Sequence, residues 1–239
     1  ATLEANLISY AHDNGFNYLI LYDVGGNVLS RDNPETALTN NQTNLSTFIQ
    51  TAKAAITHLK IGVSEGVFKT NSSTVQSIFF DNVVWYNNVV NDVNKAIDVM
   101  HLEYEYWHNT WQVNKLDFNN NYLVQLGHMR NLANATSNPH LLVETYLGEM
   151  NTTKDPGDPD NQNGLNFTEH NQADAIDPLV DRVLLHCYMP NSFMQQRLGT
   201  VNLNYVNLQF EYDYGVGMRY EAFSGNTTPT TIIPRSVST

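Results

Sequence analysis

The chain has 239 residues and carries 12 basic against 24 acidic side chains, a net charge of −12. This acidity, with no cluster of Lys or Arg, excludes an electrostatic surface for nucleic acid or an anionic membrane. The single cysteine, Cys187, excludes a disulfide within the chain and a thiolate metal site. The length suits one domain over residues 1–239. With no membrane-length apolar run and no leader-like start, we expect a secreted or extracytoplasmic, already processed protein.

Residue usage favours a neutral partner. Charged residues make up 15% of the chain and aromatic residues 11%, and the sequence is rich in Asn and Thr. A polar, uncharged surface with many tyrosines suits an oligosaccharide or glycan. We therefore expect a carbohydrate partner, and the sequence leaves the oligomeric state open.

Segments with helical spacing alternate with strand-like apolar runs along the chain. The predicted helices are 3–12, 45–58, 74–97 (one long helix or a broken pair), 122–133 and 174–180. The predicted strands are 17–24, 59–65, 98–107, 141–146, 182–188 and, less regular, 201–214. Polar, Pro- and Gly-rich residues over 151–171 predict a loop.

Repeated strand and helix argue for parallel βα units, in which functional groups gather at the carboxyl ends of the strands. The strand ends carry the polar residues Asp23, Glu65, Glu103, Glu105, Glu144, His186 and Tyr188. No Gly-rich phosphate loop follows an early strand, which disfavours a nucleotide-binding sheet. We therefore predict an α/β fold of the (β/α)₈ TIM-barrel type, irregular or incomplete in its first and last strands.

The strand predicted over 98–107 has a polar side that is equipped for chemistry. Side chains alternate along a strand, so His101, Glu103 and Glu105 share one side and Met100, Leu102 and Tyr104 share the other. Two carboxylates at this spacing perturb each other's pKa, which is how a carboxyl group becomes a general acid near neutral pH. The alternative is an amphipathic strand with its acidic side in water.

The segment Asp98-Val-Met-His-Leu-Glu-Tyr-Glu-Tyr resembles the strand-4 signature D-x-x-D-x-D-x-E of family 18 glycoside hydrolases, often followed by Tyr. It is closer to the single-domain endo-β-N-acetylglucosaminidases than to the larger chitinases. The resemblance implies a barrel in which Glu105 protonates the glycosidic oxygen. It also implies that the 2-acetamido group of the substrate attacks the anomeric carbon, oriented by Glu103 and hydrogen-bonded by Tyr188. Such a site needs no metal and no cofactor.

Two positions depart from the signature, because His101 and Glu103 stand where it has Asp. A carboxylate moved by about one bond length costs on the order of 10²-fold where the geometry is strict. A carbohydrate-binding barrel without catalysis is therefore one alternative. A second is a hydrolase with two protein carboxylates, Glu105 as acid and Glu144 or Glu211 as nucleophile. A third is a metal-dependent hydrolase that uses His101, Glu103, Glu105 and His186, although no H-E-x-x-H spacing occurs.

The predicted site has a catalytic and a binding part. The catalytic residues are Glu105, Glu103 and Tyr188. The substrate-binding residues are His101, Trp107, Glu144, His186, Asp23 and Glu65, of which Trp107 is a candidate sugar-stacking platform. The identity of the glycan and its linkage stays open.

Overall fold

The computed structural model describes residues 3–30, 37–66, 73–104, 115–136, 140–147, 175–186, 208–214 and 218–223. Glu105, Trp107, Tyr188 and the predicted loop over 151–171 lie outside these residues. The helices are α1 (Leu3–Asp13), α2 (Asn40–Ala55), α3 (Ser73–Val90) and α4 (Lys115–Ala135), with a π-helical turn at Gly25–Leu29 and a 3₁₀ turn at Asp177–Leu179. The strands are β1 (Tyr18–Leu21), β2 (Lys60–Gly66), β3 (Val99–Glu103), β4 (Leu142–Leu147), β5 (Arg182–His186), β6 (Leu208–Tyr214) and β7 (Met218–Phe223).

The described strands follow one another in the sheet in chain order, from β1 to β7. The pairs β1/β2, β4/β5 and β5/β6 are parallel. Sequential parallel strands with helices between them are the topology of βα units, so the predicted α/β class is confirmed. A closed eight-stranded barrel remains a prediction. The pair β6/β7 is antiparallel, and only residues 215–217 separate the two strands in the chain, which leaves no room for a crossover helix.

The chain divides into two units, and the division falls inside three of these elements. One unit comprises Ala1–Gly66, Ser72–Leu102 and His128–Val143. The other comprises Val67–Asn71, Glu103–Gly127 and Glu144–Thr239. The chain thus passes from one unit to the other within β3, within α4 and within β4.

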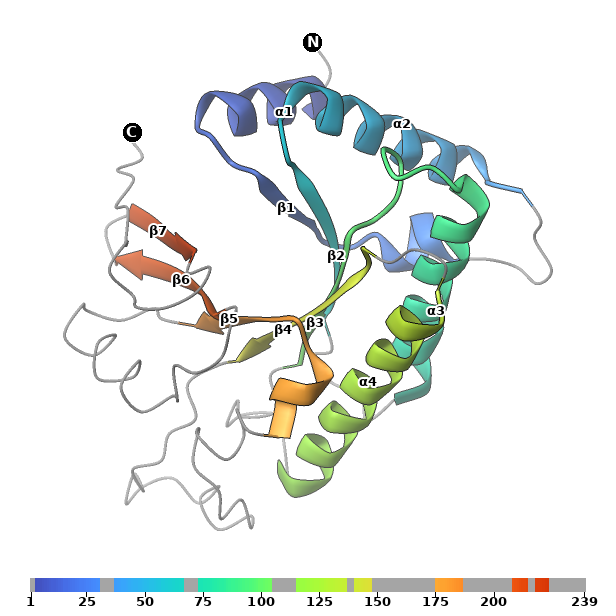
Figure 1. The fold of residues 1–239 in the computed structure, drawn as a ribbon, viewed down its shortest axis with the longest axis vertical. Coiled ribbons are helices and arrows are strands. Elements are labelled where there is room, and N and C mark those ends of the chain that lie inside the picture. Colours follow the sequence, from blue (N-terminus) through green and yellow to red (C-terminus); the bar gives the residue numbers. More distant parts are fainter. Residues whose placement is uncertain are drawn as a thin grey trace. The chain divides into compact units, whose positions relative to one another are not determined.

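The core of the first unit forms where α2 and α3 cover β2 and β3. Ile61, Val63 and Val99 are fully buried, together with Ile49 of α2 and Phe80 of α3. Helices α1 and α2 lie next to each other in this unit (Figure 1). Residues 61–64 of β2 and 99–102 of β3 are all buried, so both faces of these strands are covered, which is typical of strands packed under helices.

Local capping sets the ends of the first helices. At the end of α1, Gly15 adopts a left-handed conformation (φ 71°), and the Phe16 N–H donates to the Ala11 carbonyl over 2.8 Å. Helix α2 begins at Asn40, five residues before the predicted start at Leu45, because Thr39 and Gln42 form a capping box. The apolar spacing marks only the packed part of a helix, whereas the cap marks its first turn.

The predicted helix over 74–97 ends at Val90 and is therefore shorter than expected. Asn91 has a left-handed backbone (φ 41°), which stops the helix. The Asn87 side chain then donates to the Ile97 carbonyl (2.9 Å) and accepts from the Ile97 N–H (2.8 Å). These two bonds fix a turn that brings the chain into β3. No helix among the described residues is long and apolar enough to cross a membrane.

Candidate functional site

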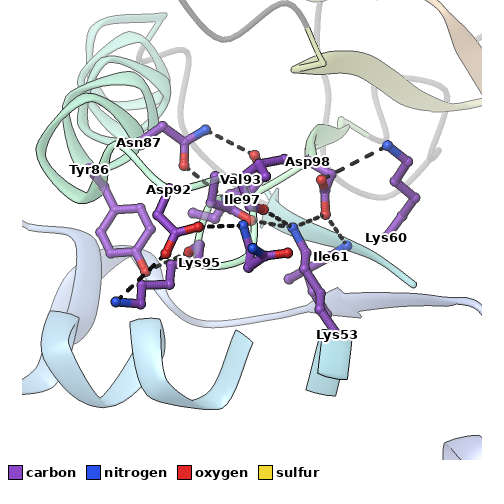
Figure 2. Close-up of polar contacts among 12 residues, drawn as sticks. Lys53, Lys60, Ile61, Tyr86, Asn87, Asp92, Val93, Lys95, Ile97 and Asp98 are labelled. Carbon is purple, nitrogen blue, oxygen red and sulfur yellow. Dashed lines mark hydrogen bonds and ion pairs between the residues drawn. The ribbon is translucent and has the colours of Figure 1, made fainter. Parts of the chain in front are cut away.

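The strand β3 is anchored at its amino end by a buried carboxylate, Asp98 (Figure 2). Its Oδ2 accepts from the Ile61 N–H of β2 over 2.8 Å and lies 2.8 Å from the Nζ of Lys53. The Nζ of Lys60 lies 3.9 Å from Oδ1. Lys53 also donates to the carbonyls of Val93 (2.9 Å) and Ala96 (2.8 Å). The first acidic position of the signature therefore ties β3 to β2, to α2 and to the turn that precedes it.

Beyond this anchor, β3 is buried on both faces. Val99 to Leu102 are buried, and His101 is only 1% exposed. The alternative of a polar face in water is therefore wrong at His101. Glu103, the last residue of the strand, is partly exposed. The strand thus presents its first accessible acidic side chain at its carboxyl end, just before Glu105.

Asp23 and Glu65 meet at the carboxyl ends of β1 and β2, as the sequence predicts. Leu21 of β1 pairs with Val63 of β2 in the parallel register. Asp23 lies two residues after Leu21, and Glu65 lies two residues after Val63. Burial raises the pKa of the Glu65 carboxyl, and the negative charge of Asp23 raises it further. The exposed Asp23 has a left-handed backbone, with φ at 59°. The pair therefore combines an exposed carboxyl group with a partly buried one whose pKa is raised.

The Glu65 carboxyl fits closely against a glycine. A Cβ at Gly25 would lie 2.8 Å from Glu65 Oε2 and 3.1 Å from a ring carbon of Phe79. A side chain at this position would displace the carboxyl or the ring. The absence of a side chain at Gly25 therefore makes room for a candidate functional group.

In the second unit, Glu144 forms a buried ion pair. It lies opposite Arg182 in the register of β4 and β5, and its Oε2 lies 2.9 Å from Arg182 Nε. Glu144 is fully buried. A fully buried carboxylate that pairs with a guanidinium is not accessible to a substrate, so this arrangement disfavours Glu144 as the nucleophile of the two-carboxylate alternative. Its role in substrate binding stays a prediction.

The backbone register also places His186 of β5 opposite Glu211 of β6. Both belong to alternatives in the sequence analysis, His186 to the metal site and Glu211 to the two-carboxylate site. Within the part of the chain whose side chains the structure describes, no three His, Cys, Asp or Glu residues are grouped for a metal ion. Glu105 and the His186 side chain, two of the four ligands of that alternative, lie outside this part.

Sequence reasoning missed the partners of the buried carboxylates, Lys53 and Arg182. A signal was present in the composition, because the chain has only 12 basic residues. Two of them are used on Asp98 and Glu144, with side chains 10% and 13% exposed. A basic residue in so acidic a chain is a good candidate for a buried ion pair.

Comparison with known proteins adds distant likenesses only. No protein-family profile and no curated protein matches the chain. One similar solved structure is YKL-39 in the presence of chitooligosaccharides, with 14% identity and a TM-score of 0.40 over 71% of this chain and 42% of that one. Another is the chitinase domain of the spore coat protein CotE from Clostridium difficile, with 16% identity and a TM-score of 0.40 over 70% of this chain and 48% of that one. The chain therefore spans less than half the length of either protein, and its function has to be argued from its own residues.

Proposed function

We propose that this chain is a glycoside hydrolase that cleaves N-acetylglucosamine-containing glycans with Glu105 as general acid. The observation that carries the proposal is the anchored strand β3. Asp98 fixes its amino end, Val99 to Leu102 are buried, and Glu103 at the carboxyl end is the first accessible acidic residue. The carboxyl end of a parallel strand is where α/β enzymes carry their catalytic groups. Glu105 follows two residues later.

In the proposed mechanism, the Glu105 carboxyl gives its proton to the glycosidic oxygen, and the bond from that oxygen to the anomeric carbon breaks. The carbonyl oxygen of the substrate's 2-acetamido group forms the new bond to that carbon. Glu103 orients the acetamido group, and the Tyr188 hydroxyl donates a hydrogen bond to it. Water, deprotonated by Glu105, then opens the cyclic intermediate and restores the acid. The route needs no protein nucleophile, unlike the two-carboxylate scheme.

Asp23 and Glu65 support the choice of a neutral, hydroxyl-rich ligand. A carboxyl group accepts hydrogen bonds, and in its protonated form it also donates one. Sugar hydroxyl groups both donate and accept. The raised pKa of Glu65 beside Asp23 favours the protonated form of Glu65 more than in an ordinary glutamate. The low content of charged residues, 15%, is in keeping with a neutral partner in an extracytoplasmic setting.

A second candidate is a carbohydrate-binding barrel without catalysis. The specific observation in its favour is His101, which is buried where the resemblance has an acidic residue. Glu103, one methylene longer than Asp, is the other departure. The change at Glu103 falls on the group that would orient the reacting acetamido group, and it affects hydrolysis more than sugar binding.

Hydrolysis and binding assays on one set of variants separate these candidates. Chitooligosaccharides and a high-mannose glycopeptide are incubated with the wild type, Glu105→Gln and the control Glu4→Gln, which makes the same charge change on an exposed residue of α1. We expect turnover by the wild type and by Glu4→Gln, and its loss in Glu105→Gln. Binding without turnover would favour the carbohydrate-binding candidate, and neither binding nor turnover would refute both.

A matched substrate tests the proposed chemistry. Cellooligosaccharides have the same β-1,4 linkage but lack the 2-acetamido group. Substrate-assisted catalysis predicts that they are not hydrolysed. Hydrolysis at a comparable rate would favour the alternative in which a protein carboxylate is the nucleophile.

A further inference from the structure

Two tyrosines and a threonine form a buried contact in the second unit, on α4, on β4 and just after β3. The centroid of the Tyr122 ring of α4 lies 6.0 Å from that of Tyr104, the residue that follows β3. The Tyr122 hydroxyl lies 2.9 Å from Thr145 Oγ1 of β4, at hydrogen-bond distance. Tyr104 is 2% exposed, and Tyr122 and Thr145 are fully buried. Through Tyr122, the end of β3 is thus tied to the middle of β4.

Each end of this contact adjoins a carboxylate of the same unit. Tyr104 follows Glu103 in the chain, and Thr145 follows Glu144. Successive side chains of a strand point to opposite faces, so Thr145 packs toward α4 while Glu144 points to the other face. A shift of Thr145 or Tyr104 therefore moves the adjacent carboxylate by a similar distance, because the two share a backbone.

We propose that Tyr122 is a positioning residue, which through Thr145 and Tyr104 fixes the end of β3 that carries Glu103. This inference rests on the proposed function, because Glu103 is the group that orients the acetamido group there. A misplacement of about 1 Å costs on the order of 10²-fold in rate where reacting groups must be aligned. The position of Glu103 therefore depends on a residue that touches no substrate.

The chain offers a matched control for a Tyr to Phe change. Tyr86 of α3 is also fully buried, and its hydroxyl donates to the Lys95 carbonyl over 3.1 Å in the first unit. Tyr122→Phe and Tyr86→Phe each remove one buried hydroxyl together with its hydrogen bonds, to Thr145 in the first case and to the Lys95 carbonyl and Ser46 in the second. A general loss of stability affects both variants, whereas a loss of positioning affects only Tyr122→Phe.

The test compares kcat, KM and melting temperature of the two variants. We expect Tyr122→Phe to lower kcat about tenfold or more with KM changed less than about twofold, and Tyr86→Phe to keep the wild-type kcat. Thr145→Val should lower kcat as Tyr122→Phe does, and Thr145→Ser, which keeps the hydroxyl, should retain it. The kcat of the double variant Tyr122→Phe/Thr145→Val should be no lower than that of either single variant, because both changes remove the same hydrogen bond. Equal kcat in Tyr122→Phe and Tyr86→Phe would overturn the inference.

A second readout separates this inference from the proposed function. Should the wild type hydrolyse none of the glycans, the proposed function fails, and amide hydrogen exchange still tests the tie between β3 and α4. We expect the amides of Leu102, Glu103 and Tyr104 to exchange faster in Tyr122→Phe than in the wild type, and at the wild-type rate in Tyr86→Phe. Unchanged exchange in Tyr122→Phe would refute the positioning role on structural grounds alone.

Discussion

Lys53→Met should destabilise the protein far more than the loss of any exposed lysine. The ammonium of Lys53 makes three contacts of 2.8 to 2.9 Å, to Asp98 Oδ2 and to the carbonyls of Val93 and Ala96. The Lys53 side chain is 10% exposed and that of Asp98 6%. Methionine keeps the length of the side chain and removes the charge. Asp98 would then be a buried carboxylate whose remaining contacts are the Ile61 N–H and the more distant Lys60.

The expected loss is about 3 kcal/mol, the lower end of the range for removing one partner of a buried ion pair. The lower end applies because Asp98 keeps the Ile61 hydrogen bond and Lys60 at 3.9 Å. For a chain of this size, about 3 kcal/mol corresponds to a fall in melting temperature of roughly 6 to 12 °C. Urea unfolding should show a lower midpoint with an unchanged slope.

Lys95→Met is the matched control, because Lys95 forms a partly exposed pair with Asp92 at 3.7 Å. Such a pair contributes less than about 1 kcal/mol. Adding Asp98→Asn to Lys53→Met should recover part of the loss, since the two groups are directly coupled. A cost for Lys53→Met as small as that for Lys95→Met, or no coupling with Asp98→Asn, would refute the account of the anchor.

Three further changes probe the carboxyl pair and two packing contacts. Because the pKa of Glu65 is raised, the folded state holds that proton more tightly than the unfolded state, and ionising Glu65 destabilises the fold as pH rises past its ordinary range. The free energy of unfolding of Glu65→Gln, measured with urea, should therefore exceed that of the wild type by more at pH 7 than at pH 4. A difference between the two proteins that does not change with pH would contradict the raised pKa. Gly62→Ala should cost about 1 to 3 kcal/mol by overpacking, because its Cβ would lie 2.6 Å from the Tyr18 hydroxyl oxygen. Calorimetry should show part of that loss restored in Gly62→Ala/Tyr18→Phe, and no restoration would mean that the hydroxyl is not the obstacle. Thr39→Ala should lower the free energy of unfolding by about 1 kcal/mol, because it removes the capping box. An unchanged urea midpoint would show that the first turn of α2 is stable without the capping box.

The sequence predicted the βα order well, because apolar periodicity reports which residues a core needs. Strands β2, β4 and β5 lie within or one residue beyond their predicted ranges. The errors arose where capping or a turn decides the outcome. Thr39 and Gln42 begin α2 early, and Asn87 and Asn91 end α3 early, through side-chain bonds that periodicity does not report. Strand β7 was missed although its sequence carries a signal, because Met218, Tyr220 and Ala222 alternate with the charged Arg219 and Glu221.

Sequence reasoning could bring two residues of the candidate site together, but it could not predict the partners of others. Residues at the carboxyl ends of paired strands, such as Asp23 and Glu65, can be placed together because parallel strands end at one edge. The burial of His101 and the pairing of Glu144 with Arg182 depend on contacts between residues far apart in the chain. Such contacts leave no local signal, since a His or Glu on a strand looks the same whether it faces solvent, a ligand or an arginine.

Neither unit is a continuous stretch of the sequence. The chain leaves one unit and enters the other inside β3, inside α4 and inside β4, and each unit is assembled from three separate stretches of chain. No single cut yields either unit as a continuous polypeptide. Domain shuffling, in evolution or in the laboratory, therefore cannot transfer one unit to another protein by exchanging a single segment.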